Sequence, residues 1–346
     1  MNLYVKIKKF LRDFVLDVNF TTRDEIFALL GASGCGKSMS LKCIAGIEMP
    51  DEGEIILNDR ILFSSDKKIN LPPQTRRVGY LFQNYALFPN MTVAENILFA
   101  AVGSESEKLR GLEENLKRFE LEGLENSYPH ELSGGQQQRV AFARILTSHA
   151  EILLLDEPFS ALDSYLKWRL ELELAEIFKS YGGSAILVSH DRGEVFRLAD
   201  KIAVMSKGNI EAVNTKHELF GNPQTVAAAI LTGCKNISAV EKISDNKIFV
   251  KDWQIELTLN KKIPDDLKFI GIRAHFLEKV DEFGENIFSA EIVKEIEDTF
   301  SYIVMIKFAE NAKSIRWEVG KDFWRKIKYG KIFIKIPEEK IILMNR

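Results

Sequence analysis

The clearest candidate for chemistry is a glycine-rich segment, GASGCGKS, at residues 31–38. It matches the spacing G-x-x-x-x-G-K-[ST] and follows an apolar run, EIFALL, that predicts a buried strand. Glycines at this spacing allow successive backbone N–H groups to turn inward around phosphate oxygens. A helix beginning at Gly36 and Lys37 would add the positive end of its dipole. The segment therefore predicts a phosphate-binding loop.

The same segment supplies a cation and a hydroxyl group. Lys37 is expected to reach the β- and γ-phosphates of ATP, and the Ser38 hydroxyl is expected to ligate Mg²⁺. The alternative is a glycine-rich turn that caps an ordinary helix. The residues predicted to bind the nucleotide from this segment are Gly31, Ala32, Ser33, Gly34, Cys35, Gly36, Lys37, Ser38 and Met39.

Two adjacent carboxylates form a second candidate, at the end of the run EILLLDEP. A buried strand would end at Asp156, whose carboxylate suits the oxygen coordination that Mg²⁺ prefers. Glu157 is then placed to act as a general base that polarises a water for in-line attack on the γ-phosphorus. The alternative is a solvated turn in which the two acids carry no chemistry.

The elements that would position these residues alternate between strands and helices, which predicts an α/β domain with a largely parallel sheet. Residues from about 85 to 150 are mainly helical and form an insertion in this domain. Strands are expected at residues 3–10, 14–20, 25–30, 53–58, 76–82, 151–156, 184–189 and 201–206. Helices are expected from residue 36 and at residues 92–102, 105–121, 134–148, 164–180 and 191–199.

The pattern changes near residue 235 to short β-rich runs separated by Asn, Asp, Gly or Pro, such as SYIVMIKF and SIRWEV. This pattern is typical of a small all-β barrel or sandwich. We therefore predict two domains, an α/β domain at residues 1–232 and a β-barrel accessory domain of the TOBE/OB-like kind at residues 233–346.

Composition excludes several classes of protein. The 346 residues are 46% hydrophobic and carry a net charge of −3, so the chain has enough apolar residues for a core and no cationic arm for nucleic acid. Three cysteines cannot form a disulfide framework, which favours a reducing compartment. No apolar run approaches the roughly 18 residues of a spanning helix, and the N-terminus lacks the pattern of a signal peptide.

A further motif, LSGGQQQR at residues 132–139, resembles the signature of ATP-binding-cassette (ABC) ATPases. The other elements of that family occur in its usual order. They are the adenine-stacking aromatic Phe10, the Q-loop glutamine Gln83, the D-loop SALD at residues 160–163 ending in Asp163, and the switch histidine His190 in VSHD.

The resemblance implies a head-to-tail homodimer in which each ATP lies between the phosphate loop of one copy and the signature of the other. Ser133, Gly135 and Gln136 would bind the nucleotide across this interface, where the N-terminus of a helix favours phosphate. Asp163 would help to join the subunits. Closure by ATP and release by hydrolysis would make the dimer a two-state switch.

The resemblance also implies roles in hydrolysis. His190 would contact the γ-phosphate and hold the water that Glu157 polarises, so these two residues and Lys37 form the predicted catalytic set. Gln83 would join Ser38 and Asp156 as a ligand of Mg²⁺ and would link the site to the helical insertion.

One position departs from the family pattern. The family usually has threonine after the Mg²⁺-ligating serine, whereas this chain has Met39. We expect the loss of a hydrogen bond to the α-phosphate to weaken nucleotide affinity slightly, with turnover intact.

Within the family, the chain resembles the ATPases of importers that carry an accessory β domain. The segment from INLPP into RRVGYLFQ resembles the molybdate-importer ATPase most, which implies an ATPase that powers import of an oxyanion. Arg273 and His275 are candidates to bind the anion in the accessory domain. Tungstate, sulfate, iron or a sugar are alternative cargoes, and a soluble ABC ATPase that does not transport is a further alternative.

The resemblance finally implies partners and a location. An integral-membrane permease pair would bind beside the Q-loop, with Tyr85, Leu87 and Phe88 as candidate contacts. An extracytoplasmic substrate-binding protein would be an indirect partner. The chain would then lie at the cytoplasmic face of the cell membrane, held there by the permease, and would have no nucleic-acid partner.

Overall fold

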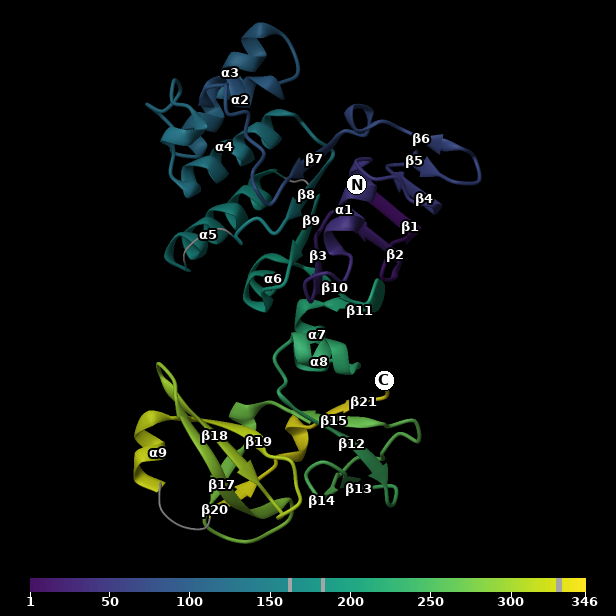
Figure 1. Ribbon diagram of the computed structural model, residues 1–346, viewed down its shortest axis with the longest axis vertical. Helices are drawn as coiled ribbons and strands as arrows, with labels where there is room; N and C mark the ends of the chain where they lie inside the picture. The colour runs from purple at the N-terminus through teal and green to yellow at the C-terminus, as the bar shows by residue number, and fades with distance from the viewer. Residues whose placement is uncertain (161–163, 182–183, 328–331) are drawn as a thin grey trace. The chain divides into compact units, whose positions relative to one another are not determined.

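The computed structural model describes residues 1–160, 164–181, 184–327 and 332–346, and these divide into two compact units, Met1–Lys216 and His217–Arg346 (Figure 1). The second unit begins with two helices, α7 (Lys216–Gly221) and α8 (Val226–Leu231). The backbone N–H of Val226 donates to the carbonyl of Arg346 at 2.8 Å, which ties α8 to the end of the chain. The domain boundary between residues 232 and 233 stays a prediction, and the division into units falls between Lys216 and His217, after the first residue of α7.

The first unit contains a sheet of eleven described strands that is parallel in one half and antiparallel in the other. In spatial order the strands are β6 (Ile69–Asn70), β5 (Arg60–Ser64), β4 (Glu52–Leu57), β1 (Asn2–Phe10), β2 (Val15–Arg23), β11 (Asn209–Thr215), β10 (Lys201–Ser206), β3 (Ile26–Gly31), β9 (Ser184–Ser189), β8 (Ile152–Asp156) and β7 (Val78–Leu81). The expected parallel pairing is found from β10 to β7 and, through one residue pair, between β11 and β2. The strands from β6 to β1 pair antiparallel. Short turns join β4 to β5 and β5 to β6, and the first of these contains Asn58 and Asp59, whose φ angles of 48° and 64° suit a two-residue hairpin.

Helices cover this sheet and form the expected insertion. Their bounds are α1 (Lys37–Ala45), α2 (Val93–Phe99), α3 (Glu105–Arg118), α4 (Gly134–Thr147), α5 (Ser164–Tyr181) and α6 (Arg192–Leu198). Figure 1 shows α2, α3 and α4 gathered as one group beside the strands. Thr92, Ser104 and Ser133 each begin one of these three helices with a reciprocal capping box, which fixes where each helix starts.

The parallel strands bring the candidate chemical residues to one edge of the sheet. β3, β8 and β9 are buried along nearly their whole length, as continuous apolar runs require when helices cover both faces. Their pairing sets Leu30 beside Ser189, and Asp156 beside Val188. The phosphate loop and the carboxylate pair therefore meet at the carboxyl ends of neighbouring strands, where α/β sheets bind ligands.

The second unit contains two five-stranded sheets of described strands. One consists of β14 (Ile255–Thr258), β13 (Lys247–Val250), β12 (Asn236–Lys242), β15 (Phe269–Ile272) and β21 (Ile342–Met344). The other consists of β16 (Glu278–Val280), β20 (Ile332–Lys335), β17 (Ile287–Glu297), β18 (Ser301–Lys307) and β19 (Ile315–Gly320). These confirm the predicted β-rich C-terminal part, to which the chain adds helix α9 (Lys321–Ile327) and the helices α7 and α8.

The core of the second unit is built around three buried tryptophans, Trp253, Trp317 and Trp324. The indole N–H of Trp317 donates to the carbonyl of Leu277 at 2.9 Å, and that of Trp324 donates to the carboxylate of Glu295 at 3.0 Å. Each indole thus buries its ring while its polar atom finds a partner, which is the usual requirement for a buried tryptophan.

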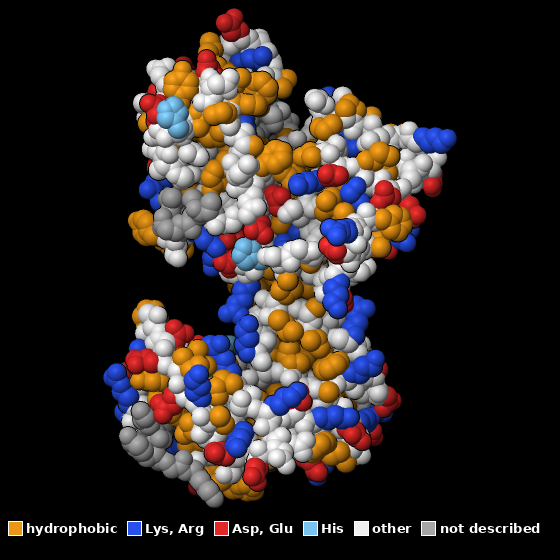
Figure 2. Space-filling view, in the orientation of Figure 1, with side chains coloured by type: hydrophobic (Ala, Val, Ile, Leu, Met, Phe, Trp, Pro, Cys, Tyr) orange, Lys and Arg blue, Asp and Glu red, His pale blue; other side chains and the backbone are white. Residues whose placement is uncertain are grey.

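Surface charge and hydropathy agree with the composition. Figure 2 shows Lys and Arg side chains interspersed with Asp and Glu on the visible face of each unit, as expected for a net charge near zero. None of the helices that the structure describes combines the length and the apolar character that a membrane crossing needs.

Arg76 binds the C-terminus of α1, the helix that follows the phosphate loop. Its side chain is fully buried and donates to the carbonyls of Cys43, Ile44 and Leu71 at 2.8–2.9 Å and to Asn70 Oδ1 at 2.8 Å. Burial lowers the pKa of Arg76 to about 10, so the guanidinium stays charged at neutral pH. It satisfies carbonyls at the C-terminus of α1 that have no partner within the helix.

Replacement of Arg76 by methionine should therefore destabilise the first unit. Each orphaned buried carbonyl costs about 1–3 kcal/mol, so the midpoint of thermal unfolding should fall by roughly 5–10 °C. Calorimetry of the full chain measures this shift. Arg110→Met, at an exposed arginine of α3, is the control and should move the midpoint by less than about 2 °C. Equal midpoints for the two variants would contradict this role of Arg76.

Candidate active site

The glycine-rich segment forms a tight loop between β3 and α1, as the sequence predicts. Gly34 and Gly36 have φ angles of +79° and +108°, in the left-handed region that side chains disfavour. At Gly31, a Cβ atom would come within 2.5 Å of the carbonyl oxygen of Met205, and at Gly36 within 2.6 Å of Leu16 Cδ1. The loop therefore needs glycine at these positions for both backbone conformation and space.

Lys37, the first residue of α1, is buried and folds back over this loop. Its ammonium donates to the carbonyls of Gly31 at 2.8 Å and Ala32 at 2.9 Å. These carbonyls hold the cation beside the backbone N–H groups at the start of the helix. The loop thus concentrates positive potential where an anion would approach.

Ser38 and Asp156 come from distant parts of the chain and are joined by a hydrogen bond. Ser38 Oγ donates to Asp156 Oδ1 at 2.6 Å, and the Tyr80 hydroxyl donates to Asp156 Oδ2 at 2.9 Å. Burial and the neighbouring charge of Asp156 raise the pKa of the Tyr80 hydroxyl, so it remains a donor. A hydroxyl and a carboxylate in direct contact are a donor set that fits Mg²⁺, which prefers oxygen ligands.

Glu157 and His190 lie together beside this pair. Glu157 has a φ angle of 47°, an unusual conformation for a residue with a side chain, and its backbone N–H donates to the carbonyl of Val188 at 3.0 Å. His190 Nδ1 is 3.2 Å from Glu157 Oε1. The arrangement places a carboxylate and an imidazole within hydrogen-bond reach of each other, the distance that a base and its partner need.

A cavity of about 400 Å³ lies between the phosphate loop and Glu157, and Asp156, Tyr80 and His190 are not among the residues that line it. Its lining comes from the phosphate loop, the turn after β1, the start of α1 and the carboxyl end of β8. The residues that line it are Leu11, Phe14, Ser33, Gly34, Gly36, Lys37, Ser38, Met39, Gln83 and Glu157. Gln83 also donates to Ser160 Oγ at 3.4 Å, so the predicted Q-loop residue reaches the predicted site.

The expected aromatic residue is not the one at the cavity. Phe10 ends β1 with 60% of its surface exposed and is not among the lining residues, whereas Phe14 is. Phe14 lies against the loop, since a Cβ atom on Gly36 would be 3.4 Å from its ring. Sequence reasoning missed Phe14 because both phenylalanines flank the same turn and only the strand register separates them.

The signature residues do not line the cavity of their own chain. Ser133 caps α4 by accepting from the backbone N–H of Gln136 at 3.3 Å, and Gln136 Oε1 accepts from the backbone N–H of Ser133 at 2.9 Å. Gly135 lies in the first turn of α4. Asp163, the predicted D-loop residue, lies outside the described residues.

The segment after Gln83 is held by the helical insertion. Arg144 of α4 donates to the carbonyls of Tyr85 at 2.9 Å and Ala86 at 2.8 Å, and its guanidinium lies 5.6 Å from the ring centroid of Phe88. Tyr85 is only 5% exposed, which makes it unsuitable as a contact for another protein, contrary to the sequence-based expectation. Leu87 and Phe88 are half-buried and stay candidate contacts.

The second unit was expected to bind an anion through Arg273 and His275. Arg273 instead donates to the carbonyls of Thr232 and Phe220 at 2.6 and 2.5 Å, which uses its guanidinium to join α7, α8 and the sheet. His275 is exposed and lies 4.2 Å from the ring of Phe276, measured between ring centroids. The bonds of Arg273 give it a structural role and engage the guanidinium that was expected to bind the anion.

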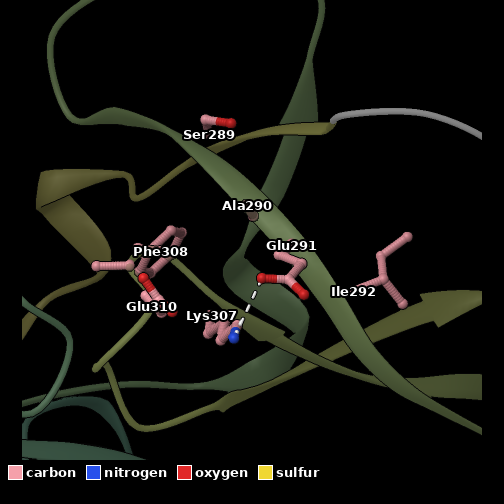
Figure 3. Close-up of a pocket in the computed structure, with 8 residues that line it drawn as sticks. Ser289, Ala290, Glu291, Ile292, Lys307, Phe308 and Glu310 are labelled. Carbon is pink, nitrogen blue, oxygen red and sulfur yellow. Dashed lines mark ion pairs between the residues drawn. The ribbon is translucent and has the colours of Figure 1, made fainter.

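A larger cavity, of about 780 Å³, lies on β17 and β18 of the same unit (Figure 3). The ammonium of Lys307 in this cavity is 3.2 Å from the carboxylate of Glu291, and Glu310 adds a second acid. The one lysine in the lining is thus neutralised by its neighbour. This cavity offers little attraction to an oxyanion.

Fold and site together define a class of protein, a nucleotide-hydrolysing cassette with a β-rich accessory unit. Residues 15–160 match the family described as ABC transporter. The chain is 38% identical over 287 residues to the Fe(3+) ions import ATP-binding protein FbpC of Haemophilus influenzae (strain 86-028NP), with 81% of each chain covered. It is 36% identical over 253 residues to the glucose import ATP-binding protein GlcV of Saccharolobus solfataricus, with 72% of this chain and 70% of that protein covered.

A solved structure extends the likeness to the fold. The dimeric ATP-binding cassette MJ0796, bound to ADP and phosphate after hydrolysis, matches with a TM-score of 0.53 and 29% identity, over 62% of this chain and 99% of that one. The chain belongs to the ATP-binding proteins of ABC transporters of the importer type. Like its relatives in this family, it is an ATP-hydrolysing transport ATPase.

The position of Phe14 generates a first prediction for the site. If Phe14 stacks on the adenine, Phe14→Leu should raise the KM for ATP roughly tenfold, because base stacking on an aromatic ring contributes about 1–3 kcal/mol. Phe10→Leu is the matched control and should leave the KM within twofold. Steady-state hydrolysis at varied ATP measures both. A larger effect of Phe10→Leu would restore the sequence-based assignment and contradict ours.

Met39 generates a second prediction. It lines the cavity and packs partly against the core of the first unit. Met39→Thr restores a hydroxyl that could bond the α-phosphate, so the dissociation constant for ATP should fall by about two- to fivefold, within the range of one neutral hydrogen bond. Calorimetric titration measures this constant. An unchanged dissociation constant would contradict the prediction that a hydroxyl at this position contributes to ATP binding.

Proposed function

We propose that this chain is the ATP-hydrolysing subunit that drives an importer. The observation that carries the proposal is a cavity lined by Lys37, Ser38 and Glu157 at the carboxyl ends of the parallel strands β3 and β8. Asp156 and His190 lie beside it, in contact with Ser38 and Glu157 respectively. Backbone N–H groups of the loop and Lys37 would bind the β- and γ-phosphates. Ser38, Asp156 and Gln83 would hold Mg²⁺, which offsets phosphate charge when bound.

The geometry also supports an order of events in hydrolysis. Glu157 would take a proton from a water that attacks the γ-phosphorus in line, while His190 contacts the γ-phosphate and orients that water. The bond to the leaving oxygen of the β-phosphate breaks, and ADP and phosphate form. The contact between His190 and Glu157 supports this division of roles because it brings base and orienting group to the same point.

The signature residues would act on a second copy of the chain. Ser133, Gly135 and Gln136 lie at the start of α4 and do not line their own cavity. We propose that the Ser133 hydroxyl and the Gly135 N–H donate to a nucleotide held by a partner, while Gln136 caps the helix beside them. A two-fold homodimer would repeat this contact and complete two sites. Asp163 is proposed to join the two copies.

The remaining partners follow from the importer class. We propose that a membrane permease pair binds the segment held by Arg144 and holds the chain at the cytoplasmic face of the membrane. An extracytoplasmic binding protein would deliver the cargo to the permease. The C-terminal unit, residues 233–346 in the sequence-based division, is proposed as an accessory domain.

The cargo is proposed from the relatives, since the ATPase itself does not enclose it. The match to the Fe(3+) importer ATPase covers 81% of each chain and so reaches into the second unit. The bonds of Arg273 to backbone carbonyls weaken the case for an oxyanion site, and the cavity on β17 and β18 adds none because its Lys307 is paired with Glu291. We therefore propose ferric iron as cargo, and molybdate, the cargo predicted from the sequence, stays the alternative.

Substitution of the proposed base tests the hydrolytic role. Glu157→Gln should keep ATP binding within about threefold and lower turnover by 100-fold or more, because the amide cannot accept the proton from water. The variant should also accumulate as a closed dimer with ATP, measured by size-exclusion chromatography with light scattering. Glu151→Gln, at an acid of the first unit paired with Arg60, is the control. Wild-type turnover in Glu157→Gln would contradict the assignment.

Uptake in cells tests the cargo. Deletion of the gene should reduce uptake of labelled Fe(III) at least tenfold and leave uptake of molybdate, spermidine and glucose unchanged. The wild-type gene should restore uptake, whereas the Glu157→Gln gene should not. A selective loss of molybdate uptake would instead support the sequence-based alternative and overturn the iron proposal.

A further inference from the structure

The residues on either side of His190 are held by a closed network of hydrogen bonds. Ser189 is buried, and its hydroxyl accepts from the backbone N–H of Asp191 at 2.9 Å and donates to Glu194 Oε2 at 2.5 Å. The bond between Ser189 and Asp191 spans His190 itself. The backbone at His190 is therefore constrained by its two neighbours and not by contacts of the imidazole alone.

Two carboxylates complete this network. Asp191 caps α6, because its Oδ1 accepts from the backbone N–H groups of Gly193 at 2.7 Å and Glu194 at 3.4 Å. Glu194 is only 4% exposed, and the bond to Ser189 leaves its second carboxylate oxygen, Oε1, for another partner. The remaining oxygens of both acids face the same point.

Lys167 of α5 occupies that point. Its ammonium lies 2.6 Å from Asp191 Oδ2 and 2.5 Å from Glu194 Oε1. The two carboxylates raise the pKa of Lys167 against the effect of burial, so the ammonium stays charged. Without this cation, two neighbouring carboxylates, one of them buried, would lack a counter-charge, which is costly in a partly dry environment.

The position of Lys167 in the chain gives this contact a functional meaning. α5 begins at Ser164, directly after residues 160–163, which the sequence predicts to meet the partner copy. Lys167 lies in the first turn of α5, and the network that it joins ends at the backbone of His190. A displacement at the start of α5 would thus be passed to the imidazole through two carboxylates and one hydroxyl.

We propose that Lys167 is a positioning residue that sets His190 against Glu157, and that it links the start of α5 to the hydrolytic step. The proposal rests on the proposed roles of His190 and Glu157 in hydrolysis. Lys167 does not line the cavity and so acts through the residues that flank His190. The link makes turnover, and not nucleotide binding, depend on the geometry of α5.

The test compares turnover with ATP affinity in full-length variants. Lys167→Met should lower kcat at least tenfold and leave the dissociation constant for ATP within twofold, whereas Lys167→Arg should recover at least a third of wild-type turnover because it keeps the charge. Lys201→Met, at a partly exposed lysine that pairs with Glu25, is the control and should match wild type. Unchanged kcat in Lys167→Met, or a parallel loss of affinity, would overturn the proposal.

A double substitution separates positioning from a general effect on structure. On a His190→Ala background, Lys167→Met should lower kcat by less than twofold further, because a residue that acts through His190 has nothing left to position. A further tenfold loss would overturn the proposal. If Lys167→Met does not fold, Lys167→Met/Glu194→Gln removes the unpaired charge as well. This double variant should also turn over at least tenfold more slowly, and wild-type turnover in it would equally overturn the proposal.

The same assays distinguish this inference from the proposed function. If His190→Ala and Glu157→Gln both keep wild-type turnover, the proposed function fails and the inference with it. If those two variants lose turnover while Lys167→Met does not, only the inference fails.

Discussion

The hydrogen bond between Ser38 and Asp156, at 2.6 Å, joins two motifs that lie 118 residues apart in the chain. It can form only because β3 and β8 flank β9 in parallel, so that their carboxyl ends meet at one edge of the sheet. Every other feature of the site depends on this alignment. It places Lys37 of the loop and the carboxylate of Glu157 in the lining of one cavity.

Two networks of hydrogen bonds and ion pairs hold the elements that carry the site. Arg76 binds the carbonyl end of α1, the helix whose start forms the phosphate loop. On the opposite side, Ser189, Asp191, Glu194 and Lys167 fix the turn that carries His190. Arg76 is buried in the first network, and Ser189 and Glu194 are buried in the second, whereas Lys167 and Asp191 are partly exposed. Loss of a partner would leave the buried groups unpaired, which is costly. The site is thus rigid at its base, while the side chains at its mouth are more exposed.

The sequence predicted much of this arrangement because the chemical motifs are local. The glycine spacing at residues 31–38 and the two acids within EILLLDEP each specify a strand end, and the structure brings them together. The antiparallel half of the sheet was not predicted. Asn58 and Asp59 tolerate the positive φ angles of a hairpin and signal the pairing of β4 with β5, whereas the pairing of β4 with β1 joins distant segments and has no local signal.

The features that the sequence could not predict depend on contacts between residues far apart in the chain and on the register of the strands. Phe10 and Phe14 are equivalent aromatics by composition, and only the fold shows which one lies on Gly36. The ion pair between Lys167 and Glu194 joins α5 to α6, and no periodic pattern in the sequence predicts it. The structural role of Arg273 was likewise hidden, because its partners are backbone carbonyls that any residue carries.

The central claim, that the loop and the carboxylate strand form one hydrolytic unit, is tested most directly by a double-mutant cycle on ATP turnover. The variants are Ser38→Ala, Asp156→Asn and the two combined, measured in the full-length chain with Mg²⁺ present. The account predicts that each single change lowers kcat at least 100-fold and that the combined variant is no more than about threefold slower than the slower single variant. Losses that multiply in the combined variant would show that the two residues act independently, and would contradict the account.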